Sequence, residues 1–359
     1  MRRAALVAMA ATAAAAGAAV VLATLAAGCS PSSGPAPTPA WHVVLHDLTP
    51  TLLSAWGASP TDVFAVGGPR GNGTPSAVLH YDGSAWSDLH VGGTDTFWWV
   101  AGTSHDDVWM VGENGRIEHY DGSGFHSYTS GTTATLYGVW PAAQNDVWAV
   151  GGTPTQGSAA PNDVVLHYDG DAWVPSPLPQ ALGRTFFKVW GVRTTDDAGV
   201  HTQIWIVGEY GTIWHQVDGT WALEASSPPL ATGNLTTVNG CSVTEVYAVG
   251  GQDVLTWDGA SWSRANVQLE NIVNGVSCNA PGIVAVVGSA GVKQRLAGGV
   301  WTSDFADDPH QDLHGVWADG QGGYWAVGGD FVSDPVPGAG RVGTLAYYGT
   351  ASVGTTLVP

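Results

Sequence analysis

Four histidines recur at matching places in the sequence and are the first candidates for metal chemistry. His80, His119, His167 and His215 each lie at the end of a short run of β-forming residues, 39 or 48 residues apart. Imidazole is a common ligand of zinc and other transition metals. A fold that places one copy of a repeat in each structural unit holds these side chains apart. We therefore expect a structural role for them and no bound metal.

Acidic residues recur as well. Asp62, Asp107 and Asp146 each precede a run of β-branched and aromatic residues, where an aspartate typically caps a turn by accepting hydrogen bonds from backbone amides. A separate acidic cluster comprises Asp304, Asp307 and Asp308. It lacks the alternating oxygen ligands of a calcium loop, so we expect no calcium there.

No group of residues indicates catalysis. The sequence contains no nucleophile elbow, no HExxH motif and no phosphate-binding glycine loop. Its arginines are scattered and do not form the cluster that sialidase chemistry needs. We expect no enzymatic activity and no cofactor, with a hydrolase as the weaker alternative.

Aromatic and amide side chains that could bind a ligand occupy a second repeated position. Four tryptophans hold it: Trp56, Trp140, Trp190 and Trp317. Asn239 takes the same place in another copy, and Asn274 lies three residues earlier in its own copy. These residues could stack on and hydrogen-bond a sugar, or the indoles could be wedges between repeating units. Both interpretations remain open.

Two cysteines lie at nearly matching places in neighbouring copies of the repeat. They are Cys241 and Cys278. In an exported protein an even pair favours a disulfide, and two buried free thiols are the alternative.

The repeat that contains all these residues predicts the fold. Seven copies of a Val-Trp-Ala-Val-Gly-like run end in glycines that lie 38 to 57 residues apart: Gly67, Gly112, Gly151, Gly208, Gly250, Gly288 and Gly328. Each copy divides into four short β-forming runs, and Asp-Gly pairs such as Asp82-Gly83 supply hairpin turns. A period near forty with four strands is typical of a propeller blade. We predict an all-β, seven-bladed β-propeller of four-stranded antiparallel blades over residues 41–359.

The spacing of one tryptophan predicts how the ring closes. Six copies have an aromatic residue at the start of their fourth run, but the seventh has none after Tyr348. Trp41 precedes Trp56 by 15 residues, the same spacing as between Phe125 and Trp140. We therefore predict that the N-terminal strand completes the last blade. The alternative is that residues 352–358 form the missing strand.

The N-terminus predicts export. Residues 1–28 combine Arg2 and Arg3 with an Ala/Val/Leu-rich stretch, as in a signal peptide. The following Cys29 resembles the lipid-modified cysteine of a bacterial lipobox, although Ala26 stands where leucine is preferred. Residues 29–40 then form a Pro/Ser-rich tether. An ordinary cleaved signal or an uncleaved anchor are the alternatives. Ser30 after the cysteine resembles an outer-membrane sorting pattern.

Charge narrows the classes of partner. The sequence has a formal net charge of −19, and removing Arg2 and Arg3 with the signal makes it more negative. Nucleic acid and anionic lipid are therefore poor partners for the folded part. Insertions at 69–76, 153–162 and 193–203 lengthen the repeat, and such loops are where a specific partner site is expected.

The repeats resemble those of secreted bacterial propellers of the tectonin and kelch type, through runs such as Asp146–Gly151 and Val165–Gly170 followed by Trp173. The Trp-Asp pair of WD-type propellers occurs only at Trp257-Asp258, and the Asp-box of sialidase-like propellers is missing. The tectonin likeness implies glycan binding. Our prediction is a monomeric, lipid-anchored envelope module that binds a protein or, alternatively, a glycan. An envelope hydrolase is the third possibility.

Overall fold

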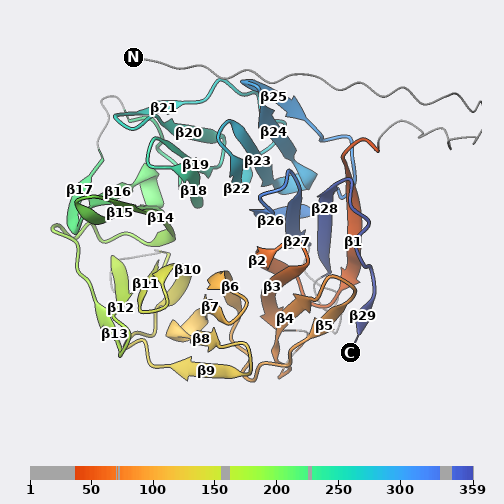
Figure 1. Ribbon diagram of the computed structural model, residues 1–359, viewed down its shortest axis with the longest axis horizontal. Coiled ribbons are helices and arrows are strands. Elements are labelled where there is room, and N and C mark those ends of the chain that lie inside the picture. The colour runs from red at the N-terminus through yellow and green to blue at the C-terminus, as the bar shows by residue number, and fades with distance from the viewer. Residues whose placement is uncertain are drawn as a thin grey trace, which may run out of the picture. The chain divides into compact units, whose positions relative to one another are not determined.

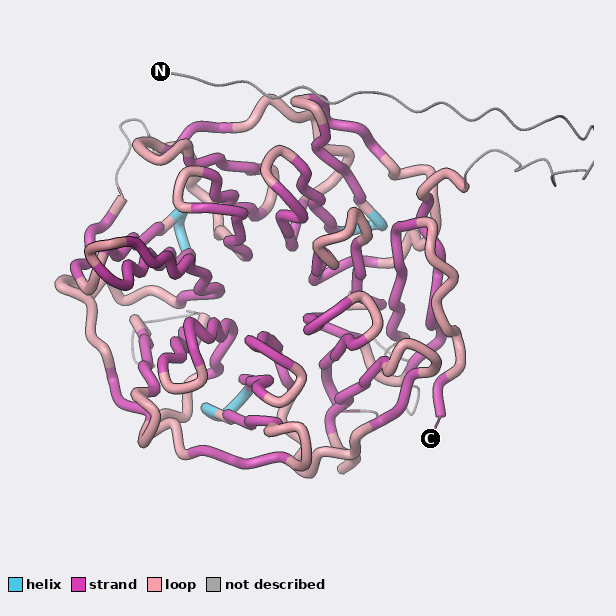
Figure 2. The backbone as a smooth tube through the Cα atoms, in the orientation of Figure 1, coloured by secondary structure: helices cyan, strands magenta, loops and turns pink. Residues whose placement is uncertain are grey.

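The strands form seven sheets that stand side by side in a ring around a central channel (Figures 1 and 2). The computed structural model describes residues 37–69, 71, 73–154, 162–224, 229–331 and 342–358. The predicted signal segment and Cys29 lie outside these residues. The ring belongs to one unit, Thr38–Pro359. It confirms the predicted seven-bladed β-propeller.

Each blade is an antiparallel sheet whose strands follow in chain order from the channel outward. The first four blades contain β2 (Leu52–Ser59), β3 (Asp62–Pro69), β4 (Ser76–Tyr81) and β5 (Trp86–Asp88); β6 (Phe97–Ser104), β7 (Asp107–Gly112), β8 (Ile117–Tyr120) and β9 (Phe125–Tyr128); β10 (Thr135–Ala143), β11 (Asp146–Gly152), β12 (Val164–Tyr168) and β13 (Trp173–Pro175); and β14 (Phe186–Asp196), β15 (Gly199–Gly208), β16 (Ile213–Val217) and β17 (Thr220–Leu223).

The remaining three blades follow the same order, except that the last one takes its outer strand from the N-terminus. They contain β18 (Thr237–Ser242), β19 (Glu245–Gly250), β20 (Asp253–Trp257) and β21 (Trp262–Arg264); β22 (Val273–Ala280), β23 (Ile283–Gly288), β24 (Lys293–Ala297) and β25 (Val300–Ser303); and β26 (Asp312–Ala318), β27 (Tyr324–Gly329), β28 (Gly343–Gly349) and β1 (Ala40–Leu48). In the described residues, the helical elements are three one-turn 3₁₀ segments: η1 (Glu113–Gly115), η2 (Glu209–Gly211) and η3 (Ser289–Gly291).

The repeated glycine lies at or near the end of the second strand in each blade, where no side chain fits. A methyl group on Gly67 would overlap the carbonyl oxygen of Thr51, which immediately precedes the first strand of the same blade. The other six copies meet the equivalent carbonyl, as Gly112 meets that of Thr96. The second strands themselves are almost wholly buried, for example all six residues of β7.

The N-terminal strand closes the ring, as the spacing of Trp41 predicts. Strand β1 pairs with β28 in antiparallel register, with Trp41 opposite Tyr348 (Figure 1). The Trp41 side chain is 6% exposed. Its ring centroid lies 5.5 Å from that of Tyr348, and its Nε1–H donates to Asp304 in the preceding blade at 3.0 Å.

The C-terminal segment does not compete for this place. Strand β29 (Leu357–Val358) pairs with β5 in parallel and gives blade 1 a fifth strand. Blade 1 therefore departs from the predicted four-stranded antiparallel blade. The two ends of the chain thus cover the outer edges of two neighbouring blades, 7 and 1. Among the described residues there is no helix long and apolar enough to cross a membrane.

The two ends of the ring differ, and we name them by their connections. The turn face carries the hairpins between first and second strands and the Asp-Gly turns between third and fourth strands. The loop face carries all other connections, including η1, η2 and η3. The described residues of the insertion at 69–76 belong to the loop face, and the insertion at 193–203 lengthens a hairpin on the turn face. Most of the insertion at 153–162 lies outside the described residues.

Candidate functional site

The first-strand tryptophans line the central channel and pack across the blade boundaries. Each indole lies against a glycine of the next blade, where a methyl group would come within 2.6 to 2.9 Å of the ring. The pairs are Trp56 on Gly102, Trp140 on Gly191, Trp190 on Gly240, and Trp317 on Gly57. The last pair joins blade 7 to blade 1. This contact explains why the tryptophans recur, and it is the wedge role considered above.

Blades without this tryptophan use smaller side chains at the same position. The Asn239 Oδ1 accepts a hydrogen bond from the backbone N–H of Cys278 in the next blade at 2.8 Å. Ser277 does the same for Ala318 at 3.0 Å. Ala101 holds this position in blade 2. The residue of blade 3 that corresponds to Cys278 and Ala318 is Pro141, which has no backbone N–H that needs an acceptor. Asn239 is therefore part of a blade joint.

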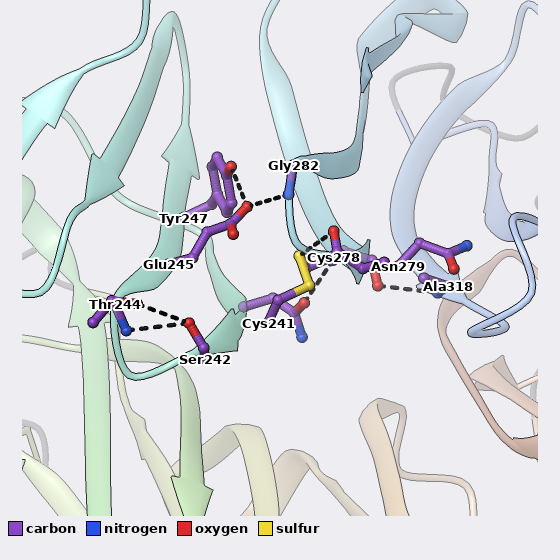
Figure 3. Close-up of a disulfide and its surroundings, with 12 residues drawn as sticks. Cys241, Ser242, Thr244, Glu245, Tyr247, Cys278, Asn279, Gly282 and Ala318 are labelled. Carbon is purple, nitrogen blue, oxygen red and sulfur yellow. Dashed lines mark hydrogen bonds between the residues drawn. A yellow bond between two sulfur atoms is a disulfide. The ribbon is translucent and has the colours of Figure 1, made fainter. Parts of the chain in front are cut away.

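A disulfide reinforces the joint between blades 5 and 6. Cys241 on β18 and Cys278 on β22 are bonded, with their Cα atoms 5.5 Å apart (Figure 3). Beside them, Glu245 accepts hydrogen bonds from the Tyr247 hydroxyl at 2.9 Å and from the Gly282 N–H of the next blade at 2.7 Å. This joint therefore combines a covalent link with polar contacts.

A cavity of about 250 Å³ remains in the channel, between the tryptophans of the first strands. Its lining includes Trp56, Trp140, Trp190, Trp317 and Asn239. It lies just below the range of about 300–1,000 Å³ typical of small-molecule sites. Because the next blade covers part of each indole, a ligand would meet only the remainder. Sugar stacking on these residues stays a prediction.

Asn274 does not belong to this cavity. Its side-chain amide donates to the carbonyl oxygen of Leu313 in the next blade at 3.1 Å. Its own carbonyl oxygen accepts from the hydroxyls of Thr236 and Thr237 in the preceding blade. The residue thus links three consecutive blades.

A second ring of side chains, which the sequence analysis missed, surrounds the channel nearer the loop face. Each of these residues lies three positions before the first-strand position that tryptophan occupies in four blades, as Asn274 does in blade 6. Trp98 lies 4.9 Å from Tyr137 and 5.8 Å from His314 between ring centroids. Tyr137 lies 5.5 Å from Phe187. The repeat register marks this position, so the sequence contained the signal.

Lys188 is buried among these rings without a carboxylate partner in the described contacts. It is 3% exposed. Its Nζ donates to the Tyr137 carbonyl oxygen at 3.0 Å and lies 3.3 Å from the centroid of the Trp99 ring. Burial holds the pKa of the Lys188 amine well below its usual range. It is one of only two lysines in the sequence.

His314 shares this environment. Its Nδ1 lies 2.7 Å from the carbonyl oxygen of Leu53, to which it donates in the neutral form. Burial and the nearby charge of Lys188 lower the pKa of His314 to about 4, although the Leu53 carbonyl opposes the shift. Burial therefore disfavours the charged forms of both Lys188 and His314 at the loop-face end of the channel.

The repeated histidines pack against aromatic side chains, and the repeated aspartates do not have the predicted role. His119 stacks on Trp109 with centroids 4.2 Å apart, and its Nε2 lies 2.8 Å from the Asp107 carboxylate. Trp109 donates to the same carboxylate at 2.9 Å. Burial acts to raise the pKa of Asp107, but these donors and Thr103 outweigh it and lower the pKa.

Blade 3 repeats this acid–aromatic–histidine arrangement, and blade 4 keeps the aromatic and the histidine with Gln203 in place of the acid. Asp146 accepts from His167 and Trp148, and His215 stacks on Trp205 and contacts Gln203. The prediction that these aspartates cap backbone amides was wrong, because imidazole and indole N–H groups reach the carboxylates across the sheet. Backbone capping belongs to the Asp-Gly turns, where the Asp82 carboxylate accepts from the N–H groups of Ser84 and Ala85.

Asp304 is occupied by other partners. Its oxygens accept from Arg295 at 2.5 and 2.9 Å and from the Trp41 indole. The Asp304 carboxylate is therefore engaged by a guanidinium group and an indole N–H. The absence of calcium at this cluster stays a prediction.

The turn face is acidic. Eight of its aspartates are exposed: Asp82, Asp106, Asp169, Asp171, Asp196, Asp197, Asp218 and Asp258. Among the described residues of this face, Arg193 is the only exposed arginine, and both lysines are buried. Uncompensated charge of one sign attracts cationic partners.

A hairpin extends from the same face in blade 4. Strands β14 and β15 stay paired as far as Asp196 and Gly199. Near its tip, Val200 is 51% exposed. His201 lies between Asp196 and Asp218, whose carboxylates raise the pKa of its imidazole. The insertion at 193–203 thus presents an apolar side chain beside acidic ones.

Comparisons with known proteins show the fold. No protein-family model matches the sequence, and no match appears among the curated proteins compared. The structure is similar to that of YCF48 bound to D1 peptide, with a TM-score of 0.61 and 13% identity over 88% of this chain and 98% of that one. YCF48 from Cyanidioschyzon merolae gives 0.57, with 14% identity over 86% and 98%. The WD40 β-propeller domain of Doa1 gives 0.61, with 8% identity over 85% and 96%.

The wedge contact can be tested with a double-mutant cycle on Trp190 and Gly240. Trp190→Ala should cost about 3–5 kcal/mol of unfolding free energy, because it opens a cavity. Gly240→Ala should also destabilise, since its methyl group would lie 2.5 Å from the carbonyl oxygen of Glu245 and 2.9 Å from the indole. If the two residues pack together, the double variant should cost about 1–3 kcal/mol less than the sum. Denaturant unfolding measures all four proteins.

The matched control combines Trp190→Ala with Gly57→Ala, which faces Trp317 instead. This pair should be additive within about 0.5 kcal/mol. Additivity at Trp190 and Gly240 would show that the indole does not hold the joint.

Lys188 should make stability depend on pH. In the unfolded chain its amine keeps a proton up to about pH 10, whereas the folded state disfavours that proton. Lys188→Met should therefore be more stable than the wild type at pH 7, by about 1–4 kcal/mol. This advantage should shrink as pH rises toward 10. Thermal or denaturant unfolding across pH 7–10 measures it, and a difference that does not change with pH would contradict a buried neutral amine.

Proposed function

We propose that this protein is a non-catalytic binding module whose partner is a protein segment carrying basic residues. The observation that carries the proposal is the acidic turn face, with eight exposed aspartates against a single exposed arginine among its described residues. Such a surface attracts cationic segments and speeds their association. The exposed Val200 on the β14–β15 hairpin would add an apolar contact.

The use of the repeated residues supports a binding role over catalysis. Most repeated histidines, acids and tryptophans are engaged in joints within or between blades. Residues that deviate from the repeat, such as the hairpin at 193–203, are left to recognise a partner.

The similar solved structures support the same class. One of the two YCF48 structures described above is a complex with a peptide, as its description states. We transfer from it only the idea that a propeller of this size can hold a peptide. A tectonin-like glycan module is the competing class, and the small channel cavity supports it less well.

We further propose that lipid on Cys29 anchors this module to the cell envelope of a bacterium, most simply at the outer membrane. The support is the sequence pattern of residues 1–40. Two or more acyl chains on one cysteine are enough for stable anchoring. The Pro/Ser-rich tether would let the propeller reach a partner away from the bilayer.

Peptide binding can be tested directly. The full chain should bind peptides from a charge-graded array in proportion to their Lys and Arg content, and more weakly at high salt. Asp196→Asn/Asp197→Asn/Asp218→Asn should weaken binding several-fold, because it removes three charges near the hairpin. Asp307→Asn/Asp308→Asn, on the loop face, is the control and should change little. Binding to a glycan array without peptide binding would favour the lectin alternative.

Anchoring has its own test. Cys29→Ser should release the protein from membranes or leave it at precursor size in cell fractions. A variant that fractionates with membranes at mature size, as the wild type does, would show that lipid on Cys29 is not the anchor.

A further inference from the structure

Blade 1 brings two histidines and an aspartate together on the turn face. Asp62 begins β3, His80 lies on β4, and His105 lies in the turn between β6 and β7 of blade 2. The Asp62 Oδ1 is 2.7 Å from His80 Nε2, and its Oδ2 is 2.9 Å from His105 Nδ1. One ligand atom from each residue lies within 4.8 Å of the others.

Comparison with other blades shows that this cluster is not required by the repeat. In blades 2 and 3 the aspartate accepts from one histidine and from the indole of Trp109 or Trp148. Blade 1 has Phe64 at the indole position, so the Asp62 carboxylate lacks that donor. His105 takes its place from the neighbouring blade. The position equivalent to His105 is Gln144 in blade 3 and Pro60 in blade 1, so the fold does not need an imidazole there.

The sequence analysis expected one histidine per blade to exclude a metal site. That reasoning compared only third-strand histidines, which the ring does hold apart. It did not consider that a turn residue of the next blade can reach the same carboxylate. His105 is the residue that it missed.

We propose that Asp62, His80 and His105 bind a zinc ion. Two imidazole nitrogens and one carboxylate are a common zinc ligand set, whereas calcium and magnesium prefer oxygen ligands alone. Zinc bonds of about 2.0–2.1 Å in a tetrahedron place donor atoms roughly 3.4 Å apart. The Asp62 Oδ1–His80 Nε2 and Asp62 Oδ2–His105 Nδ1 distances are now 2.7 and 2.9 Å, so zinc binding requires these pairs of atoms to move apart by about half an ångström.

The surroundings allow this adjustment and leave one coordination position open. The side chain of His105 is 46% exposed, so it can rotate, while His80 and Asp62 are 16% and 20% exposed. His80 stacks on Phe64 at 4.5 Å, which fixes its ring. The exposed side of the cluster would offer the fourth position to water or to a donor from a bound partner. The acidic turn face would also raise the local concentration of cations.

The site can be tested on the full chain, purified without a histidine tag and stripped of metal with a chelator. Calorimetric titration with zinc chloride should show one saturable site. His105→Gln should weaken binding more than about tenfold, since losing even a supporting contact of a metal site typically costs 10–100-fold. Cobalt(II) bound to the wild type should give the intense visible bands of tetrahedral coordination, and these should be lost in the variant.

His167→Gln is the matched control, because its Asp146 pair lacks a third ligand. It should leave zinc affinity unchanged. His105→Gln should keep the fold, because the side chain is exposed, and His80→Gln provides a second test. Absence of saturable binding, or a site that persists in both His105→Gln and His80→Gln, would overturn the proposal. Binding lost in His201→Gln instead would place the metal at the Asp196–His201–Asp218 cluster and would also overturn it.

Discussion

The close approach of neighbouring first strands around the channel is the contact on which the whole ring depends. Where one blade presents tryptophan, the next presents glycine, and the indole lies on the exposed backbone. Where it presents asparagine or serine, the next presents a free backbone N–H. Each solution suits only its own neighbour. The order of the blades is thus specified by pairs of side chains, and Trp317 on Gly57 completes the circle. The disulfide lies at the joint of Asn239 and Cys278, where no indole is buried.

Polar groups hold each blade together nearer the turn face. A buried carboxylate is costly unless it is fully hydrogen-bonded. Asp107 meets this condition through imidazole, indole and hydroxyl donors. The same carboxylate fixes the orientation of His119 on Trp109, so stacking and hydrogen bonding support one another. This arrangement ties the second and third strands of a blade and explains why acid, aromatic and histidine recur together.

Much of the fold could be predicted from the sequence, because the same local constraints act on every copy of the repeat. Glycine must end the second strand where a carbonyl group crosses it, and Asp-Gly must turn between strands. Trp41 could be placed by counting, since its spacing to Trp56 matches that between Phe125 and Trp140. The partners of Asp62 and Asp107 could not be predicted in this way. Their hydrogen bonds join strands or blades far apart in sequence, and only the three-dimensional register brings those donors together. Lys188 was visible as a rare residue, but its burial depends on three blades at once.

A repeat protein also contains its own internal controls, and these separate structural from functional residues. A residue that recurs in several copies is explained by a joint that those copies share, as the wedge tryptophans show in four blades. A residue that departs from the pattern needs another explanation. Ser277 and Asn239 depart from it, yet each satisfies the backbone N–H of its neighbour and so remains structural. His105 also departs from it, and its contact with Asp62 of blade 1 is not one that the repeat requires, since glutamine holds the equivalent place in blade 3. The hairpin at 193–203 likewise extends beyond the length that its blade needs. Both lie on the acidic face, and recognition is therefore most economically assigned to that side of the ring.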